Sequence, residues 1–138
     1  MPLSIGGLLY VGWRSRELAM WSWARAIGIA DAASGLRAAL RALGEPPEWL
    51  RFTIPDVLWV YALTWSVARL QRGSRPFVKA AWLLVPAALG PGAELLQAVG
   101  LLPGTFDALD LAGCALAFGL GAWRGGASTR ATDGSVRA

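Results

Sequence analysis

Four polar residues near the C-terminal third are of a type and spacing that could support chemistry. Glu94 and Gln97 stand three residues apart, as do Asp107 and Asp110, and this spacing places each pair on one face of a helix. The short turn around Pro103-Gly104 makes the two helices antiparallel neighbours, so both pairs could face one shallow cavity. Paired carboxylates can act as a general acid and base, or attract a cationic ligand.

The rest of the chain argues against most catalytic chemistry. It contains no histidine and a single cysteine, Cys114, which excludes imidazole catalysis, an internal disulfide and a cysteine-rich metal site. No nucleophile–base pattern and no EF-hand spacing occurs. We therefore expect no metal and no cofactor, favour a non-enzymatic protein, and interpret Cys114 as a packing residue.

The composition favours contact with lipid. The 138 residues are 55% hydrophobic and 16% charged, with eight tryptophans and a mean hydropathy of +0.45. Soluble domains average about 25% charged residues, and tryptophan is enriched at membrane interfaces. The net charge of +4 does not indicate nucleic-acid binding, because residues 80–123 contain no Lys or Arg.

Three apolar segments predict transmembrane helices, at residues 54–70, 77–102 and 106–123. Pro55 fits the first helical position of the first segment. The second segment is interrupted at Pro86 and at Gly90-Pro91-Gly92, which predicts a kinked or broken helix. In the third, two rows of small residues recur every four positions (Gly113, Ala117 and Gly121; Ala115 and Gly119), a spacing that permits close helix packing in membranes.

The N-terminal third leaves alternatives open. Residues 3–11 and 18–30 are apolar but short. They could form one long helix with a charged belt, a pair of short re-entrant or interfacial helices, or a cleaved signal peptide. Residues 32–43 carry leucines on one face and arginines on another, which is typical of an amphipathic interfacial helix.

Basic residues predict the orientation. Arg69, Arg72, Arg75 and Lys79 follow the first predicted span, and Arg124 follows the last. The positive-inside rule then places the C-terminus in the cytoplasm. Asp56 would join the other acids on the outer side, although Asp56 and Asp107 could instead cap helices.

An acid at membrane depth needs a partner. The basic candidates in the N-terminal third are Arg14, Arg16 and Arg25, and we expect one of them to pair with one of the acids. Arg25 is favoured, because it lies within an apolar run.

Residues 56–121 resemble VanZ-like proteins, small bacterial four-helix membrane proteins whose founding member is associated with low-level teicoplanin resistance. The resemblance rests on Glu94, Gln97 and Asp110 around the Pro103-Gly104 turn. Thr105, Cys114 and Ala117 stand where the family has Arg, Asn and Gly. The resemblance implies the four-helix fold and an envelope location.

Together these observations predict an all-α, multi-pass protein of the bacterial cytoplasmic membrane. Residues 1–124 would form one bundle of three firm transmembrane helices and an N-terminal helical region, followed by a disordered tail at 125–138. Its function would be to engage a polar or cationic envelope ligand through Asp56, Glu94, Gln97, Asp107 and Asp110. Alternatives are a subunit of a larger membrane complex, and a cation-coupled transporter or membrane enzyme. Membrane lipids, other subunits or a second copy are the expected partners.

Overall fold

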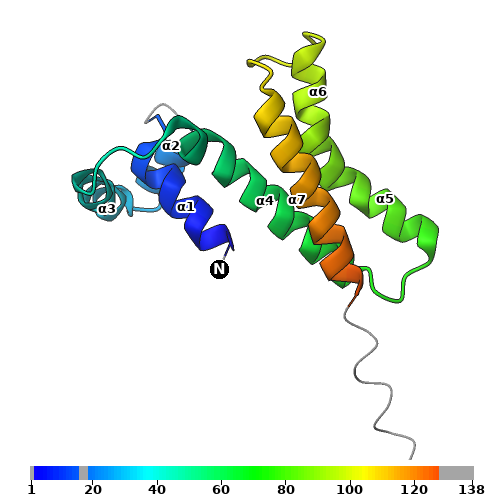
Figure 1. The fold of residues 1–138 in the computed structure, drawn as a ribbon. Coiled ribbons are helices and arrows are strands. Elements are labelled where there is room, and N and C mark those ends of the chain that lie inside the picture. The colour runs from blue at the N-terminus through cyan, green and yellow to red at the C-terminus, as the bar shows by residue number, and fades with distance from the viewer. Residues whose placement is uncertain (1, 16–18, 128–138) are drawn as a thin grey trace, which may run out of the picture. The chain divides into compact units, whose positions relative to one another are not determined.

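The computed structural model describes residues 2–15 and 19–127, and within these ranges all regular secondary structure is helical (Figure 1). The elements in chain order are α1 (Pro2–Trp13), α2 (Ala19–Ala26), α3 (Ala30–Ala42), α4 (Glu48–Leu70), α5 (Pro76–Ala87), the π-helical turn η1 (Ala88–Gly92), α6 (Ala93–Ala98) and α7 (Ala108–Gly126). The prediction of an all-α fold is confirmed. The chain divides into two compact units, Met1–Pro55 and Asp56–Ala138, here called unit 1 and unit 2.

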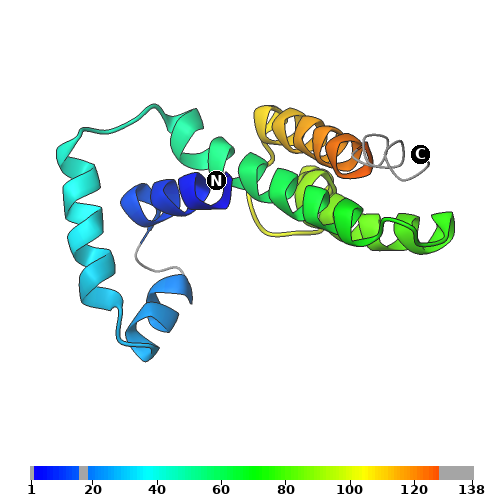
Figure 2. The same cartoon turned by 90° about the horizontal axis from the view of Figure 1, so that it is seen from below.

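Unit 1 is organised around the packing of α3 on α1. Figure 2 shows the C-terminal end of α1 pointing at α3. The Arg37 side chain, only 6% exposed, donates hydrogen bonds from Nη1 to the carbonyl oxygens of Val11 (2.9 Å) and Arg14 (2.7 Å). These carbonyls lie at the end of α1, where a helix has unsatisfied acceptors and a partial negative charge. Arg37 therefore caps α1 and joins it to α3.

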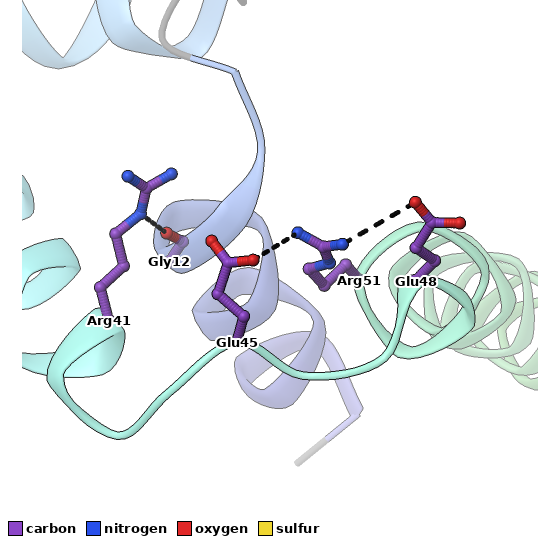
Figure 3. A network of polar contacts seen from close by, with 5 residues as sticks. All are labelled: Gly12, Arg41, Glu45, Glu48 and Arg51. Atoms are coloured by element: carbon purple, nitrogen blue, oxygen red, sulfur yellow. Dashed lines mark hydrogen bonds and ion pairs between the residues drawn. The ribbon is translucent and has the colours of Figure 1, made fainter.

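A second set of polar contacts holds the segment between α3 and α4 (Figure 3). Arg41 donates from Nε to the Gly12 carbonyl at 3.3 Å. Arg51, in the first turn of α4, forms ion pairs with Glu45 at 3.7 Å and with Glu48 at 4.0 Å. Both glutamates are highly exposed, so these two pairs contribute little to stability.

Unit 2 is built on the close approach of α4 and α7. Its core contains Val60, Cys114 and Ala117. A Cβ atom added to Gly121 would lie 2.9 Å from Thr64 Cβ, and one added to Gly125 would lie 2.5 Å from Ala68 Cβ. Contacts therefore advance along both helices in the same direction, and α4 and α7 are parallel.

Only one of the two predicted rows of small residues makes this contact. Ala117 and Gly121 are buried, whereas Gly113, the first residue of this row, is half-buried. The same side of α7 also buries Cys114 and Gly125. Ala115 and Gly119 are exposed, and no atom lies within 4 Å of a Cβ added at Gly119.

The predicted break in the second apolar segment is confirmed. The α5 helix ends after Pro86, and Pro91 lies in η1. Gly90 is buried within η1, where a Cβ atom would lie 2.6 Å from Val60 Cγ2. The break thus allows the backbone to approach α4, and it is followed by α6, with Glu94 in its first turn.

The predicted transmembrane helices and the multi-pass membrane location are wrong. Within the described residues, no helix combines the length and the apolar character that a bilayer crossing needs. A crossing takes about 20 predominantly apolar residues. α4 includes Asp56 and Arg69, η1 divides the second segment, and α7 includes Asp110 and Arg124.

The N-terminal third forms separate short helices. Because α1 ends at Trp13, a single long helix through this region is excluded. Pro55 lies inside α4, which starts at Glu48, so the prediction that Pro55 occupies the first helical position is also wrong. The expectation of a helical bundle is confirmed. The single domain over 1–124 stays a prediction beside the two compact units, and residues 128–138 of the expected tail lie outside the described residues.

Candidate functional site

The two polar pairs of the predicted site, Glu94 with Gln97 and Asp107 with Asp110, meet at one end of unit 2. The backbone N–H of Asp107 donates to Oε2 of Glu94 at 3.4 Å, which joins the start of α7 to α6. The connection between these helices folds back through Gly104. A Cβ atom there would lie 2.8 Å from the amide carbon of Gln97, and the backbone has φ +138°. The positive φ favours glycine at this position, and the short contact shows that the Gln97 side chain packs directly on the turn.

Asp107 has a structural role in α7. Its side chain accepts a hydrogen bond from the backbone N–H of Leu109 at 2.8 Å, which makes it the N-cap of the helix. The prediction that Asp107 could cap a helix is confirmed. Asp56, the other predicted cap, lies in the interior of α4, so capping is not its role.

Cys114 is buried near three carboxylates. Its side chain is buried in the core of unit 2, as its interpretation as a packing residue predicted. Burial, together with the negative charges of Asp56, Asp110 and Glu94, raises the pKa of the Cys114 thiol from an ordinary 9.0 to about 11. Carboxylates from α4, α7 and α6 therefore act on one buried point, although sequence analysis gave Cys114 no part in the site. The available signal was its position one helical turn after Asp110.

One oxygen of the Asp110 carboxylate lacks a hydrogen bond. Its Oδ1 atom is buried and has no hydrogen-bond partner among the described residues. A buried polar atom without a partner costs about 1–3 kcal/mol. Such an atom would be stabilised by a ligand that donates a hydrogen bond. We call Asp56, Glu94 and Asp110 the acidic end of unit 2.

Basic side chains gather at the opposite end of the same unit. Arg72 donates from Nε to the Gly125 carbonyl at 2.7 Å, at the C-terminal end of α7. Arg69 lies in the last turn of α4, with its guanidinium 5.2 Å from the centre of the Trp65 ring. Because α4 and α7 are parallel, these cations lie a helix length from the acids. Glu94 and Asp110 make no ion pair with any described residue.

The three arginines proposed as partners of the acids belong to unit 1. Arg14 donates from Nη2 to the Phe52 carbonyl at 3.3 Å, and its guanidinium lies 5.2 Å from the Tyr10 ring centre. Arg25 is exposed in the last turn of α2. Arg16 lies outside the described residues. A pair between one of these arginines and the acidic end stays a prediction.

Among the described residues, no group of three or more His, Cys, Asp or Glu side chains is placed to hold a metal ion. The chain matches no protein-family model, no curated protein and no solved structure. The function is therefore argued from the acidic end itself.

Titration of Cys114 tests whether the three carboxylates surround it. We expect the ultraviolet absorbance of the thiolate, taken as the difference from Cys114→Ala, to rise with pH around a midpoint near 11. This measurement needs no reagent to reach the buried side chain. Asp110→Asn should lower this midpoint, since it removes one negative charge. Because burial is the larger cause of the raised pKa, a midpoint that Asp110→Asn leaves unchanged would contradict the placement of the acids. Because the pKa of the Cys114 thiol is raised in the folded state, the protonated thiol contributes to the free energy of unfolding. This contribution is complete below pH 9 and is lost as the pH rises to about 11.

Proposed function

We propose that the acidic end of unit 2 binds the cationic group of a ligand. The observation that carries the proposal is the separation of charge within the unit. The negative charges of three helices act on the buried Cys114 thiol, while Arg72 caps the far end of α7. An organic ammonium or amidinium group would place a positive charge beside Glu94 and Asp110, and would supply a hydrogen-bond donor for Asp110 Oδ1.

Each residue of the predicted site would have its own role in binding the cation. Glu94 and Asp110 would contact the cation directly, and Asp56 would add its charge from α4. Asp107 would hold the start of α7, because its side chain already accepts from Leu109. Gln97, packed on Gly104, would keep the connection between α6 and α7 in place. Charge-assisted hydrogen bonds are roughly twice as strong as neutral ones, so Glu94 and Asp110 should dominate affinity.

Benzamidine and benzamide form a matched pair of probes, because they share size and shape while only benzamidine is charged at pH 7. We expect benzamidine to raise the midpoint of thermal unfolding, since a ligand that binds the folded state stabilises it. Benzamide should have no effect. Glu94→Gln should weaken the apparent affinity for benzamidine at least tenfold, because the substitution keeps the shape of the side chain and removes its charge. The shift in unfolding midpoint at a given benzamidine concentration should shrink accordingly.

Asp31→Asn is the control variant, since Asp31 is an exposed acid of α3 in unit 1. It removes the same charge from the chain and should leave the benzamidine shift unchanged. Equal shifts with benzamidine and benzamide, or equal losses in the Glu94 and Asp31 variants, would contradict a cation site at the acidic end.

A second candidate function is that of a subunit in a larger assembly. The observation that favours it is an exposed apolar face on α7, made by Leu109, Leu116, Leu120 and Trp123. Apolar patches of this kind mark interaction sites more often than isolated exposed residues do. A second chain that purifies with the protein would support this candidate.

The resemblance to VanZ-like proteins stays a prediction. On that resemblance, the cationic ligand would be an envelope component or a glycopeptide antibiotic. The alternatives of a transporter and an enzyme also stay predictions.

A further inference from the structure

The side of α7 that faces away from α4 carries large apolar residues at a regular spacing. Leu109, Leu116 and Trp123 follow one another at intervals of seven residues, which places them on one helix face. They are 53%, 69% and 66% exposed. Figure 2 shows α7 at the edge of unit 2. This face is therefore turned outward over most of the length of the helix.

A row of small residues lies beside the large ones. Ala112 and Gly119 are exposed and Gly126 is half-buried, again at intervals of seven residues. No atom lies within 4 Å of a Cβ added at Gly119, so the space above this glycine is open. The two rows alternate at spacings of three and four residues, which is the pattern of the a and d positions of a coiled coil. We call the two rows together the α7 seam, which consists of Leu109, Ala112, Leu116, Gly119, Trp123 and Gly126.

The alternation of large and small residues distinguishes between the two directions in which a second α7 could pack. A parallel copy would place a positions opposite a positions, so large side chains would meet and small residues would face each other across a void. An antiparallel copy places a positions opposite d positions. In the register that sets Leu116 opposite Gly119, every large residue of the seam faces a small one. The other two pairs in this register are Leu109 with Gly126 and Trp123 with Ala112.

The charges of unit 2 favour the same direction. Asp110 lies in the first turn of α7 and Arg124 in its last turn. In the antiparallel register, Arg124 of one copy stands within one residue of the level of Asp110 of the other. Asp56 and Arg69 are separated in the same sense along α4, which is parallel to α7. An antiparallel pair therefore sets acids at the level of cations, whereas a parallel pair sets like charges beside each other.

We propose that unit 2 forms an antiparallel dimer with two-fold symmetry through the α7 seam. The partner is a second copy of this chain, because α7 supplies both the large side chains and the spaces that receive them, together with charges of both signs. A two-fold interface uses the same surface on both copies, and the α7 seam is complementary to itself. The proposal rests on the second candidate function and names the partner of the exposed α7 face. It is independent of the cation site.

Filling the space above Gly119 tests the dimer. We expect sedimentation velocity of the full-length protein to show a dimer whose share grows with protein concentration. Gly119→Leu should raise the dissociation constant of the dimer at least tenfold, because the new side chain stands where Leu116 of the second copy packs. The circular dichroism spectrum should stay that of the parent protein, since a Cβ at this position meets no atom of its own chain within 4 Å.

Two variants are matched controls for Gly119→Leu. Gly119→Ala keeps a small residue at this position and should leave the dimer in place, since Ala112 occupies an equivalent position of the seam. Gly35→Leu adds the same side chain to an exposed glycine of α3 in unit 1, where a Cβ also meets no atom within 4 Å. This variant should have the same dissociation constant as the parent protein.

Disulfide trapping tests the direction of the two helices. In Cys114→Ala protein, copies with Leu116→Cys would be mixed with larger, tagged copies with Gly119→Cys under mild oxidation. We expect disulfides between unlike copies to predominate on a non-reducing gel. Only the antiparallel register brings positions 116 and 119 of two copies opposite each other, and a disulfide requires Cα atoms within about 7 Å.

Three results would overturn the proposal. The first is a parent protein that stays monomeric at every concentration, and the second is an equal effect of Gly119→Leu and Gly35→Leu on the dimer. The third is that disulfides form between like copies as readily as between unlike ones. A monomeric parent protein whose α7 face binds a different chain would keep the second candidate function and end this proposal. None of these results bears on the cation site, which is measured through the benzamidine shift.

Discussion

Replacing Gly121 with alanine is expected to lower the free energy of unfolding by about 3 kcal/mol, near the upper end for overpacked cores. The added Cβ would lie 2.9 Å from both Thr64 Cβ and the Tyr61 carbonyl oxygen, and 3.1 Å from the Trp65 backbone nitrogen. Two of these atoms belong to the α4 backbone, which cannot move aside as a side chain does. The two helices must therefore separate, and the core around Cys114 opens.

Gly119→Ala is the control for this prediction, two residues earlier on the same helix. Its Cβ would meet no atom within 4 Å, so only helix propensity changes, and the variant should gain about 0.5–1 kcal/mol. Urea unfolding followed by circular dichroism measures both. Equal effects of the two substitutions would contradict the close packing of α4 on α7.

Replacing Arg37 with methionine is expected to cost about 3 kcal/mol, since each of its two hydrogen bonds from a charged donor contributes about 1.5–3 kcal/mol. The substitution leaves the carbonyl oxygens of Val11 and Arg14 without their donor. Hydrogen–deuterium exchange should therefore accelerate in α1 and α3 and stay unchanged in α7, because α7 belongs to the other unit.

Arg41→Met is the comparison for Arg37. Arg41 is exposed and makes one longer bond, at 3.3 Å to Gly12, so its loss should cost below 1 kcal/mol. An Arg37 variant no less stable than the Arg41 variant would show that α3 does not depend on its buried arginine.

Local pattern was enough to predict the helices of unit 2. Apolar runs at 54–70, 77–102 and 106–123 fall within or close to α4, α5–α6 and α7, because helix formation follows sequence-local periodicity. Proline and glycine predicted the break at η1, since proline removes a backbone donor and glycine weakens the helix at identifiable positions. The meeting of Glu94 with Asp107 followed from the short turn between their helices.

Other features depend on partners distant in sequence. The acceptors of Arg37 lie 23 and 26 residues away, and nothing in the alternation of Leu and Arg along α3 reveals that the arginines face inward. Membrane crossing was predicted from the composition and from three apolar segments, whereas a crossing requires one helix to stay apolar along about 20 residues. The charges of Asp56 and Asp110 interrupt α4 and α7, and the same residues form the acidic end.

The π-helical turn at Ala88–Gly92 has a consequence for how related sequences are aligned. A π turn closes over five residues, so it holds one residue more than an α turn. The wider turn takes up the extra residue, so the helix on either side of it keeps its orientation. Deleting that residue would therefore restore a regular α-helix without turning Glu94 away from the Asp107 N–H to which it is bonded. A one-residue gap at this point in an alignment is compatible with a relative that keeps this junction.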